Sequence, residues 1–485
     1  MTHFLLNSLL MQRRAFLRAT SAAAAAAGAP SFLLSGCGTN LPKADLVVDP
    51  NIPWWRQHNF GPVFDELDET DLKVRGAIPP ELNGVYVRNG SNPQASDNTH
   101  WFLGDGMVHG VRLGGGEAKW YRNRYVRTTF HEDGIGFGVP QGPNTYANVS
   151  LVYHADRLLA SGEVGFPYEL NPSDLSTVGV RDFAGELNNY FTAHPAIDPA
   201  TGFMHFFGYG FGPPFLTYCV ADDQGTLLSC EAVAARGATM MHSFAITDRD
   251  AIFWELPVVF DLSVLSETGW MFRWDADFGA RIGVMPLGGP ASEIRWVEIE
   301  PCYVFHHLNA FRVGDDIVVD VCRYDEMMNG ERFGAIDPQL RRWTIGTAGE
   351  ELTFSESTLS ERNIEFPYSD RRNFGRATRY GWFTSLRDHP ETLDPAGVVR
   401  YDSQTGMIDE WEPSPYRQSG EPLFVPAGDG EGDGWLLTFV YDRSADATDL
   451  VILDATAVGG GPVAEVRMPR RVPHGFHGTW VPDQA

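Results

Sequence analysis

Several histidines stand in sequence contexts that suit a metal site with imidazole ligands. The candidates are His194, His242, either member of the adjacent pair His306 and His307, and either His474 or His477. Spacings such as 242 − 194 = 48 and 306 − 242 = 64 residues are far wider than the ligand spacing of a local zinc motif. They fit an arrangement in which several blades of a radial fold each bring one histidine to a common axis.

The pair His306 and His307 lies in the apolar run Cys302–Phe311, and a β-rich segment, Asp316–Cys322, follows at once. Neighbouring side chains of an extended strand point to opposite faces, so at most one of the two histidines can face a given interior. A histidine in such a strand is most often hydrogen-bonded to the backbone and has no further role. The pair by itself therefore does not establish a metal ligand.

Short strands separated by turn residues run along most of the chain. Segments such as Gly84–Arg88, Ala251–Trp254 and Gly434–Tyr441 read as strands, and turn sequences such as Asp198–Gly202 separate them. Glycine and proline, 51 and 32 residues, recur throughout, and no long amphipathic helix interrupts them. We therefore expect an all-β fold, a β-propeller that forms a single domain over residues 60–485. No recognisable repeat gives the number of blades.

The charge balance disfavours nucleic acid as a partner. The chain has 37 basic and 63 acidic residues and a formal net charge of −26. Nucleic-acid binding depends on Lys and Arg side chains that neutralise phosphates, and this chain repels polyanions instead.

The first 37 residues are typical of an export signal rather than of folded structure. Arg13 and Arg14 precede an alanine-rich apolar run, as in a twin-arginine signal, and Leu34–Cys37 resembles a lipoprotein processing site. We predict that residues 1–37 direct export, that Cys37 is lipidated, and that residues 38–59 tether a periplasmic protein to the membrane. The sequence leaves open whether Met1 or Met11 is the true start.

The remaining cysteines show no metal-ligand spacing; they are Cys219, Cys230, Cys302 and Cys322. Their apolar contexts predict buried packing residues, although an oxidising compartment permits disulfides.

Eight motifs occur along residues 60–485 in an order that is itself informative. They are Gly84–Pro93, Gly104–Gly110, Ala193–Pro195, His242–Thr247, Phe305–Ala310, Ile364–Pro367, Gly420–Val425 and Gly475–Gly478. Together they resemble the carotenoid cleavage oxygenase family. The resemblance implies a seven-bladed β-propeller, with a few short helices and loops over its iron face, that holds Fe(II) through four histidines on the axis.

Matching the motifs residue by residue implies the ligands His194, His242, His306 and His477. This choice leaves His307 and His474 as neighbours of the site or as packing residues. Imidazole nitrogen suits iron, and four such ligands on a six-coordinate ion leave two positions for O₂ and for water or substrate.

The resemblance also implies three carboxylates behind the ligands, which are Glu163, Glu365 and Glu421. A carboxylate that accepts the N–H of the ring nitrogen that does not bind the metal fixes the tautomer and restrains the ring.

The implied reaction is the cleavage of a carotenoid or apocarotenoid double bond by O₂, which gives two carbonyl products and needs no cofactor other than Fe(II). The expected apolar tunnel has six candidate lining residues, which are Trp101, Phe102, Trp254, Phe305, Tyr324 and Phe476. An apolar-rich loop around Phe260–Trp274 is expected to contact a membrane or a lipid substrate.

Other functions stay open at this point. Family members that cleave phenolic stilbenes or phenylpropenes typically carry a tyrosine and a lysine for the phenol, and the matching positions here, Thr99 and Phe130, have neither. This difference favours a non-phenolic polyene. Isomerisation on the same scaffold is a further alternative, and a periplasmic propeller dehydrogenase or hydrolase is an alternative from another class.

Overall fold

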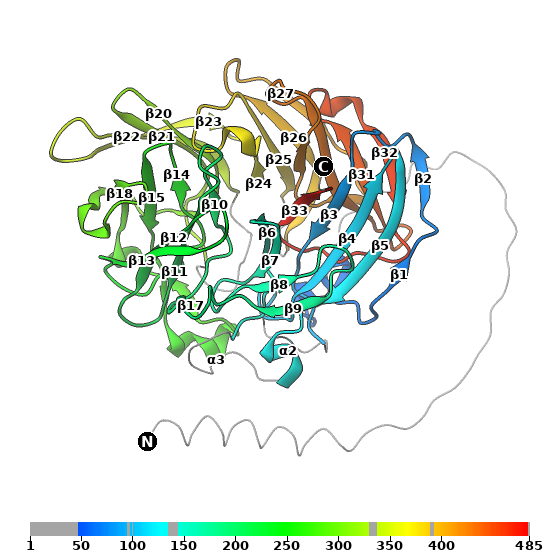
Figure 1. Ribbon diagram of the computed structural model, residues 1–485, viewed down its shortest axis with the longest axis horizontal. Coiled ribbons are helices and arrows are strands. Elements are labelled where there is room, and N and C mark those ends of the chain that lie inside the picture. Colours follow the sequence, from blue (N-terminus) through cyan, green and yellow to red (C-terminus); the bar gives the residue numbers. More distant parts are fainter. Residues whose placement is uncertain are drawn as a thin grey trace, which may run out of the picture. The chain divides into compact units, whose positions relative to one another are not determined.

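Seven antiparallel sheets follow one another along the chain and form the blades of a β-propeller (Figure 1). The computed structural model describes residues 47–94, 98, 100–133, 144–328, 337–388 and 392–483, all within one compact unit. The prediction of an all-β, seven-bladed propeller is confirmed. The export signal and Cys37 lie outside the described residues, so both stay predictions.

Blades 2 to 6 each contain four strands that pair in chain order. Blades 2 and 3 are formed by β6 (Ser150–His154), β7 (Arg157–Ser161), β8 (Tyr168–Leu170), β9 (Thr177–Val180) and by β10 (Ala196–Ile197), β11 (Met204–Tyr209), β12 (Leu216–Ala221), β13 (Leu227–Val233). Blades 4 and 5 are formed by β14 (Ala245–Ile246), β15 (Asp250–Glu255), β18 (Ala280–Pro286), β19 (Arg295–Ile299) and by β20 (Tyr303–Val313), β21 (Asp316–Tyr324), β22 (Gln339–Gly346), β23 (Thr353–Ser360). Blade 6 is formed by β24 (Ile364–Tyr368), β25 (Tyr380–Arg387), β26 (Asp394–Asp402) and β27 (Ile408–Trp411).

Blades 1 and 7 combine segments from both ends of the domain. Blade 1 contains β1 (Asp68–Glu69), β3 (Gly84–Arg88), β4 (Met107–Gly114), β5 (Glu117–Tyr125) and the C-terminal β33 (Gly478–Pro482). Blade 7 contains β28 (Arg417–Ser419), β29 (Leu423–Pro426), β30 (Gly434–Asp442), β31 (Ala447–Asp454), β32 (Pro462–Arg467) and the N-terminal β2 (Lys73–Gly76). The pairs β3–β33 and β2–β32 close the ring, so it cannot open without breaking strand hydrogen bonds.

Large aromatic side chains fill the interfaces between blades. Trp382 of blade 6 stacks on Phe424 of blade 7 with ring centroids 4.6 Å apart, and its Nε1–H donates to the carbonyl of Ala455 at 3.0 Å. Trp254 of blade 4 packs edge-on against Trp343 of blade 5. Such contacts bury a large apolar area and hold neighbouring blades in a fixed relation.

The described helices are short. They are α2 (Thr129–Asp133), α3 (Leu265–Thr268) and the 3₁₀ turns η1 (Trp54–Arg56), η2 (His58–Phe60), η3 (Leu262–Val264), η4 (Ala276–Phe278), η5 (Ala291–Glu293), η6 (Arg371–Asn373) and η7 (Val458–Gly460). Among the residues with a described structure, none belongs to a helix with the length and apolar character needed to cross a bilayer. In η1, which falls in the predicted tether, Trp54 packs against Phe60 and Trp101.

The predicted apolar loop forms a small hairpin of β16 (Val258–Phe260) and β17 (Phe272–Trp274), with η3 and α3 between its strands. Phe260 stacks on Phe211 at 4.3 Å, whereas Leu262 and Leu265 keep 61% and 40% of their surface exposed. The hairpin is therefore anchored by aromatic packing and presents aliphatic side chains to solvent.

Candidate metal centre and its cavity

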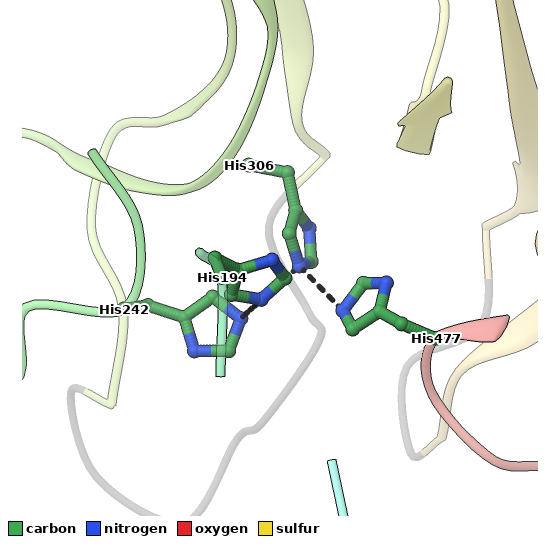
Figure 2. Close-up of side chains that lie close together, drawn as sticks. All are labelled: His194, His242, His306 and His477. Atoms are coloured by element: carbon green, nitrogen blue, oxygen red, sulfur yellow. Dashed lines mark hydrogen bonds between the residues drawn. The ribbon is translucent and has the colours of Figure 1, made fainter. Parts of the chain in front are cut away.

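The four histidines predicted as iron ligands lie together, although the chain separates them widely (Figure 2). His194 and His242 precede the first strands of blades 3 and 4, His306 lies within β20 of blade 5, and His477 immediately precedes β33 of blade 1. Their donor nitrogens all lie within 4.8 Å of one another. The Nε2 atoms of His194 and His242 are 2.9 Å apart, and His306 Nε2 lies 3.1 Å from those of both His242 and His477.

The remaining three blades each contribute one of the predicted carboxylates to the same centre. Glu365 of β24 accepts a hydrogen bond from His306 Nδ1–H at 2.6 Å, and Glu421, between β28 and β29, accepts one from His477 Nδ1–H at 2.8 Å. Glu163, which follows β7, places Oε1 2.7 Å from His242 Nδ1, although the ring N–H is not aligned for a hydrogen bond.

Within the described part of the chain, no carboxylate pairs with His194. The ring of His194 contacts the other three histidines, at centroid distances of 4.5 to 5.1 Å.

The positions of the carboxylates determine which ring nitrogen carries the proton. A carboxylate at Nδ1 favours the tautomer with hydrogen on Nδ1, which leaves the lone pair on Nε2. Burial, and to a smaller extent the charges of the neighbouring histidines, hold the pKa of His194 and of His306 well below the usual range. Protonation therefore does not remove the lone pairs on their Nε2 atoms. Lone pairs that converge in this way repel one another unless a cation lies between them.

The donor set fits an iron site. Metal–nitrogen bonds of about 2.1 Å at right angles place neighbouring nitrogens about 3 Å apart, close to the observed 2.9 and 3.1 Å. Imidazole is a favourable donor for iron, and an ion held by four histidines keeps positions for further ligands.

Each carboxylate is itself held by a second donor. The hydroxyl of Tyr324 donates to Glu365 Oε1 at 3.1 Å, that of Tyr209 donates to Glu163 Oε2 at 3.0 Å, and the Gly478 N–H donates to Glu421 Oε2 at 2.8 Å.

Burial raises the pKa of Glu365 to about 8, although the Phe366 N–H and the Tyr324 hydroxyl favour its ionised form. A cation at the centre would offset this cost of burying a carboxylate.

Irregular backbone directs His306 toward the centre. In the register of β20 against β21, Val304 pairs with Arg323 and His307 with Val321, so Phe305 and His306 together face Cys322 in a β-bulge.

A second irregularity follows Glu365, where Phe366 has a φ of 52°, a left-handed conformation that is uncommon outside glycine. Its ring stacks on His306 at 5.5 Å.

The two neighbouring histidines lie outside the cluster, as the motif match implied. His307 Nδ1 lies 3.0 Å from the Ser243 hydroxyl, and burial, with a smaller effect of Arg371, lowers its pKa to about 3. His474 Nε2 lies 3.2 Å from Gln418 Oε1.

An aromatic cavity leads to the metal centre. Three of the histidines, His242, His306 and His477, form part of its wall, and about 800 Å³ of space, open solvent at the mouth included, is free of protein atoms. Five of the six aromatic residues predicted for a tunnel line it; they are Trp101, Phe102, Phe305, Tyr324 and Phe476.

The prediction for Trp254 is wrong, because its ring is buried between Trp343 and His307. Phe130 of α2 packs against Tyr146, and Thr99 lies outside the described residues.

A seven-bladed propeller with an all-histidine centre at the end of an aromatic cavity defines a metal-dependent enzyme for apolar substrates. The chain belongs to the family described as retinal pigment epithelial membrane protein, RPE65, whose model matches residues 60–482 and which includes the carotenoid cleavage oxygenases. The resemblance of the eight motifs is thus confirmed.

The chain is 35% identical over 489 aligned residues to a carotenoid cleavage oxygenase of Mycobacterium tuberculosis, which covers 87% of this chain and 96% of that protein. The structure of Pseudomonas brassicacearum lignostilbene dioxygenase superposes with a TM-score of 0.82 at 27% identity and covers 89% of this chain and 99% of the other. A variant of Synechocystis apocarotenoid oxygenase gives 0.78 at 28% identity, with 88% and 98% covered.

The roles of the adjacent histidines can be separated by substitution. We expect His306→Ala to weaken iron binding by more than about a hundredfold, because loss of a ligand exceeds the 10- to 100-fold effect of losing an outer partner. His307→Ala should retain iron, since its ring contacts Ser243 rather than the cluster. Iron per protein, measured after anaerobic loading with Fe(II), checks both, and retention by His306→Ala with loss by His307→Ala would show that the assignment is inverted.

Glu421→Gln tests the support of His477. The carboxylate accepts hydrogen bonds from His477 and from the Gly478 N–H, whereas an amide has one acceptor oxygen and turns its NH₂ group toward one of these donors. We expect iron affinity to fall by about 10- to 100-fold, as measured by competition with a chelator. Glu410→Gln, which removes a carboxylate that pairs with Arg362 on blade 6, is the control and should leave the affinity unchanged.

Proposed function

We propose that the protein is a non-haem iron dioxygenase that cleaves a carbon–carbon double bond of a carotenoid or apocarotenoid with O₂ and releases two carbonyl products. The observation that carries this proposal is the aromatic cavity that ends at the four-histidine cluster. An elongated conjugated chain matches such a wall, because its apolar surface replaces water along the whole contact. The similarity to a carotenoid cleavage oxygenase and to an apocarotenoid oxygenase supports the same substrate class.

The cavity residues of this chain bind and orient the substrate and exclude water. Phe305 and Phe366 flank His306, so they can fix the plane of a conjugated chain beside the metal centre. Trp101 packs against Phe476 at 4.6 Å and extends the apolar wall away from the histidines. The iron ion, when bound, supplies the redox chemistry that O₂ requires.

Cleavage of a stilbene is the second candidate, and the similarity to lignostilbene dioxygenase favours it. A stilbene is also a conjugated alkene with an apolar body, so the aromatic wall alone does not separate the two substrate classes. The difference lies in length and in the polar group at the end of the molecule.

Isotopically labelled O₂ tests the reaction. Iron-loaded protein incubated with an apocarotenal should give two carbonyl products, each with one labelled oxygen atom, and should act on a hydroxystilbene with lower kcat/KM. Product analysis by mass spectrometry checks both substrates. Absence of label from every product would exclude the oxygenase reaction, and an isomerised alkene without label would identify isomerisation instead.

We also propose that the protein is exported as a lipoprotein and acts at a membrane. Cys219 and Cys230 face each other across β12 and β13 and form a disulfide, whereas Cys302 and Cys322 are buried thiols. A disulfide supports an oxidising compartment, because cytosolic thiols are usually kept reduced. The exposed Leu262 and Leu265 of the hairpin supply an apolar surface for lipid contact.

Cell fractionation tests this location. Substituting both Arg13 and Arg14 with lysine should retain the protein in the cytoplasm, and Cys37→Ser should move the exported protein from the membrane to the soluble fraction. The denatured exported protein should show two reactive thiols before reduction and 2 + 2 = 4 after it, from the two thiols and the disulfide. Membrane association that is unchanged in Cys37→Ser would contradict the lipid anchor.

A further inference from the structure

One wall of the aromatic cavity is polar, and blade 6 supplies it. Asn363, Arg387 and Asp394 all line the cavity. Arg387 ends β25 and pairs in register with Asp394, the first residue of β26, and the carbonyl of Asn363 accepts the N–H of Leu386 at 3.0 Å. Arg387 and Asp394 are paired strand ends and Asn363 immediately precedes β24, so the three residues lie at the same end of the blade 6 sheet.

Asp394 keeps one carboxylate oxygen without a partner among the described residues. Its Oδ1 accepts hydrogen bonds from Gln418 Nε2 at 2.6 Å and from Arg387 Nη1 at 3.3 Å. Its Oδ2 has no hydrogen-bond partner among the described residues, although the residue is only 6% exposed. Asp394 lines the cavity, so this oxygen is an acceptor without a protein partner on a residue that a ligand in the cavity would contact.

The neighbouring polar groups of blade 6 add a second acceptor without a partner. The guanidinium of Arg387 is engaged by Asp394, Glu412 and the carbonyls of Pro395, Ser414 and Arg417. The amide of Asn363 donates to Asp337 at 2.7 Å, which leaves its Oδ1 buried and without a partner. A hydroxyl group can donate a hydrogen bond to these two acceptors, and an aldehyde, ketone or ether cannot do so.

We propose that Asp394 selects substrates that carry a hydroxyl group at one end, on a hydroxylated ring or a phenol, and that Asn363 assists by accepting from the same group or a bound water. This inference rests on the proposed function, since it describes how the substrate of that reaction is held. A site built to bind a hydroxyl rejects the analogue without it, because its buried acceptors then stay unpaired.

Asp394 also contributes to the fold, and the test must separate the two roles. Its bond to Gln418, whose own amide oxygen contacts His474, links β26 to the segment before β33. A purely structural role would reduce stability and affect all substrates alike. A role in recognition changes the preference between two substrates that differ in one hydroxyl.

The first measurement needs no variant. Two apocarotenals of equal length, with and without a ring hydroxyl, are compared with the iron-loaded protein by kcat/KM and, without O₂, by dissociation constants from the quenching of tryptophan fluorescence. A hydrogen bond to a charged group predicts a preference of about tenfold or more for the hydroxylated compound. 4-Hydroxystilbene and 4-methoxystilbene form a second pair for the phenolic class.

Asp394→Asn is the diagnostic variant. The amide can still accept from Gln418, but it turns an NH₂ group toward the cavity and no longer offers a free acceptor. The preference should fall to near one through a higher KM for the hydroxylated compound, while iron content and the kcat/KM of the other compound stay unchanged. Asp402→Asn is the matched control, because Asp402 is also 6% exposed, ends the same strand and pairs with Arg379 outside the cavity.

The outcomes separate the two proposals. Equal rates and affinities for the members of both pairs in the unsubstituted protein would overturn the role of Asp394 and leave the oxygenase function intact. Tighter binding of the hydroxylated compounds without cleavage would overturn the proposed reaction and support the hydroxyl site. A preference that survives in Asp394→Asn, or an equal loss on both compounds, would reduce Asp394 to a structural residue.

Discussion

One constraint governs the metal centre. The imidazole lone pairs of four histidines converge on one point, where they repel one another unless a cation lies between them. Each of the seven blades contributes one residue to this point: blades 1, 3, 4 and 5 supply the histidines, and blades 2, 6 and 7 supply the carboxylates. A shift of any blade moves one donor, so the accuracy of the centre depends on the packing between blades, as at Trp382 and Phe424. The two ring closures matter for the same reason, because His477 reaches the centre only through the β3–β33 pair.

Charge gives a second reason for a cation at this point. Glu365 and Glu421 are buried and Glu163 is nearly buried. Because the histidines are neutral, these carboxylates would place up to three uncompensated negative charges in a low-dielectric interior if no cation were bound. The pKa of Glu365, raised to about 8 by burial, shows the cost of that arrangement. A divalent ion offsets most of this charge, so metal binding and the stability of the folded centre are coupled. The tyrosines that donate to Glu163 and Glu365 keep the carboxylates oriented in either state.

The fold and the clustering of the four histidines could be predicted because local motifs carry the family resemblance that implies both. The residue-by-residue match of the motifs selected His306 and His477, and strand alternation allows only one of His306 and His307 to face the interior. The bulge that directs His306, and the left-handed Phe366, depend on strand register and have no local signature.

Residues joined only by folding were missed for a similar reason. Tyr209 supports Glu163 from another blade, and the Cys219–Cys230 disulfide follows from the pairing of β12 with β13, which spacing along the chain does not reveal. Trp254 was assigned to the tunnel on residue type alone, and the same type fills the interface between blades.

The polar wall of blade 6 adds a constraint that the metal centre cannot supply. An apolar tunnel by itself lets a conjugated chain slide, because each shift by one double bond exchanges one set of dispersion contacts for an equivalent set. A hydrogen bond at one end removes this degeneracy, since only one position of the chain satisfies Asp394 and places an alkene beside His306. The distance along the substrate from hydroxyl to cleaved bond is then fixed by the strands that carry these two residues, β26 and β20, and not by the chemistry of the iron.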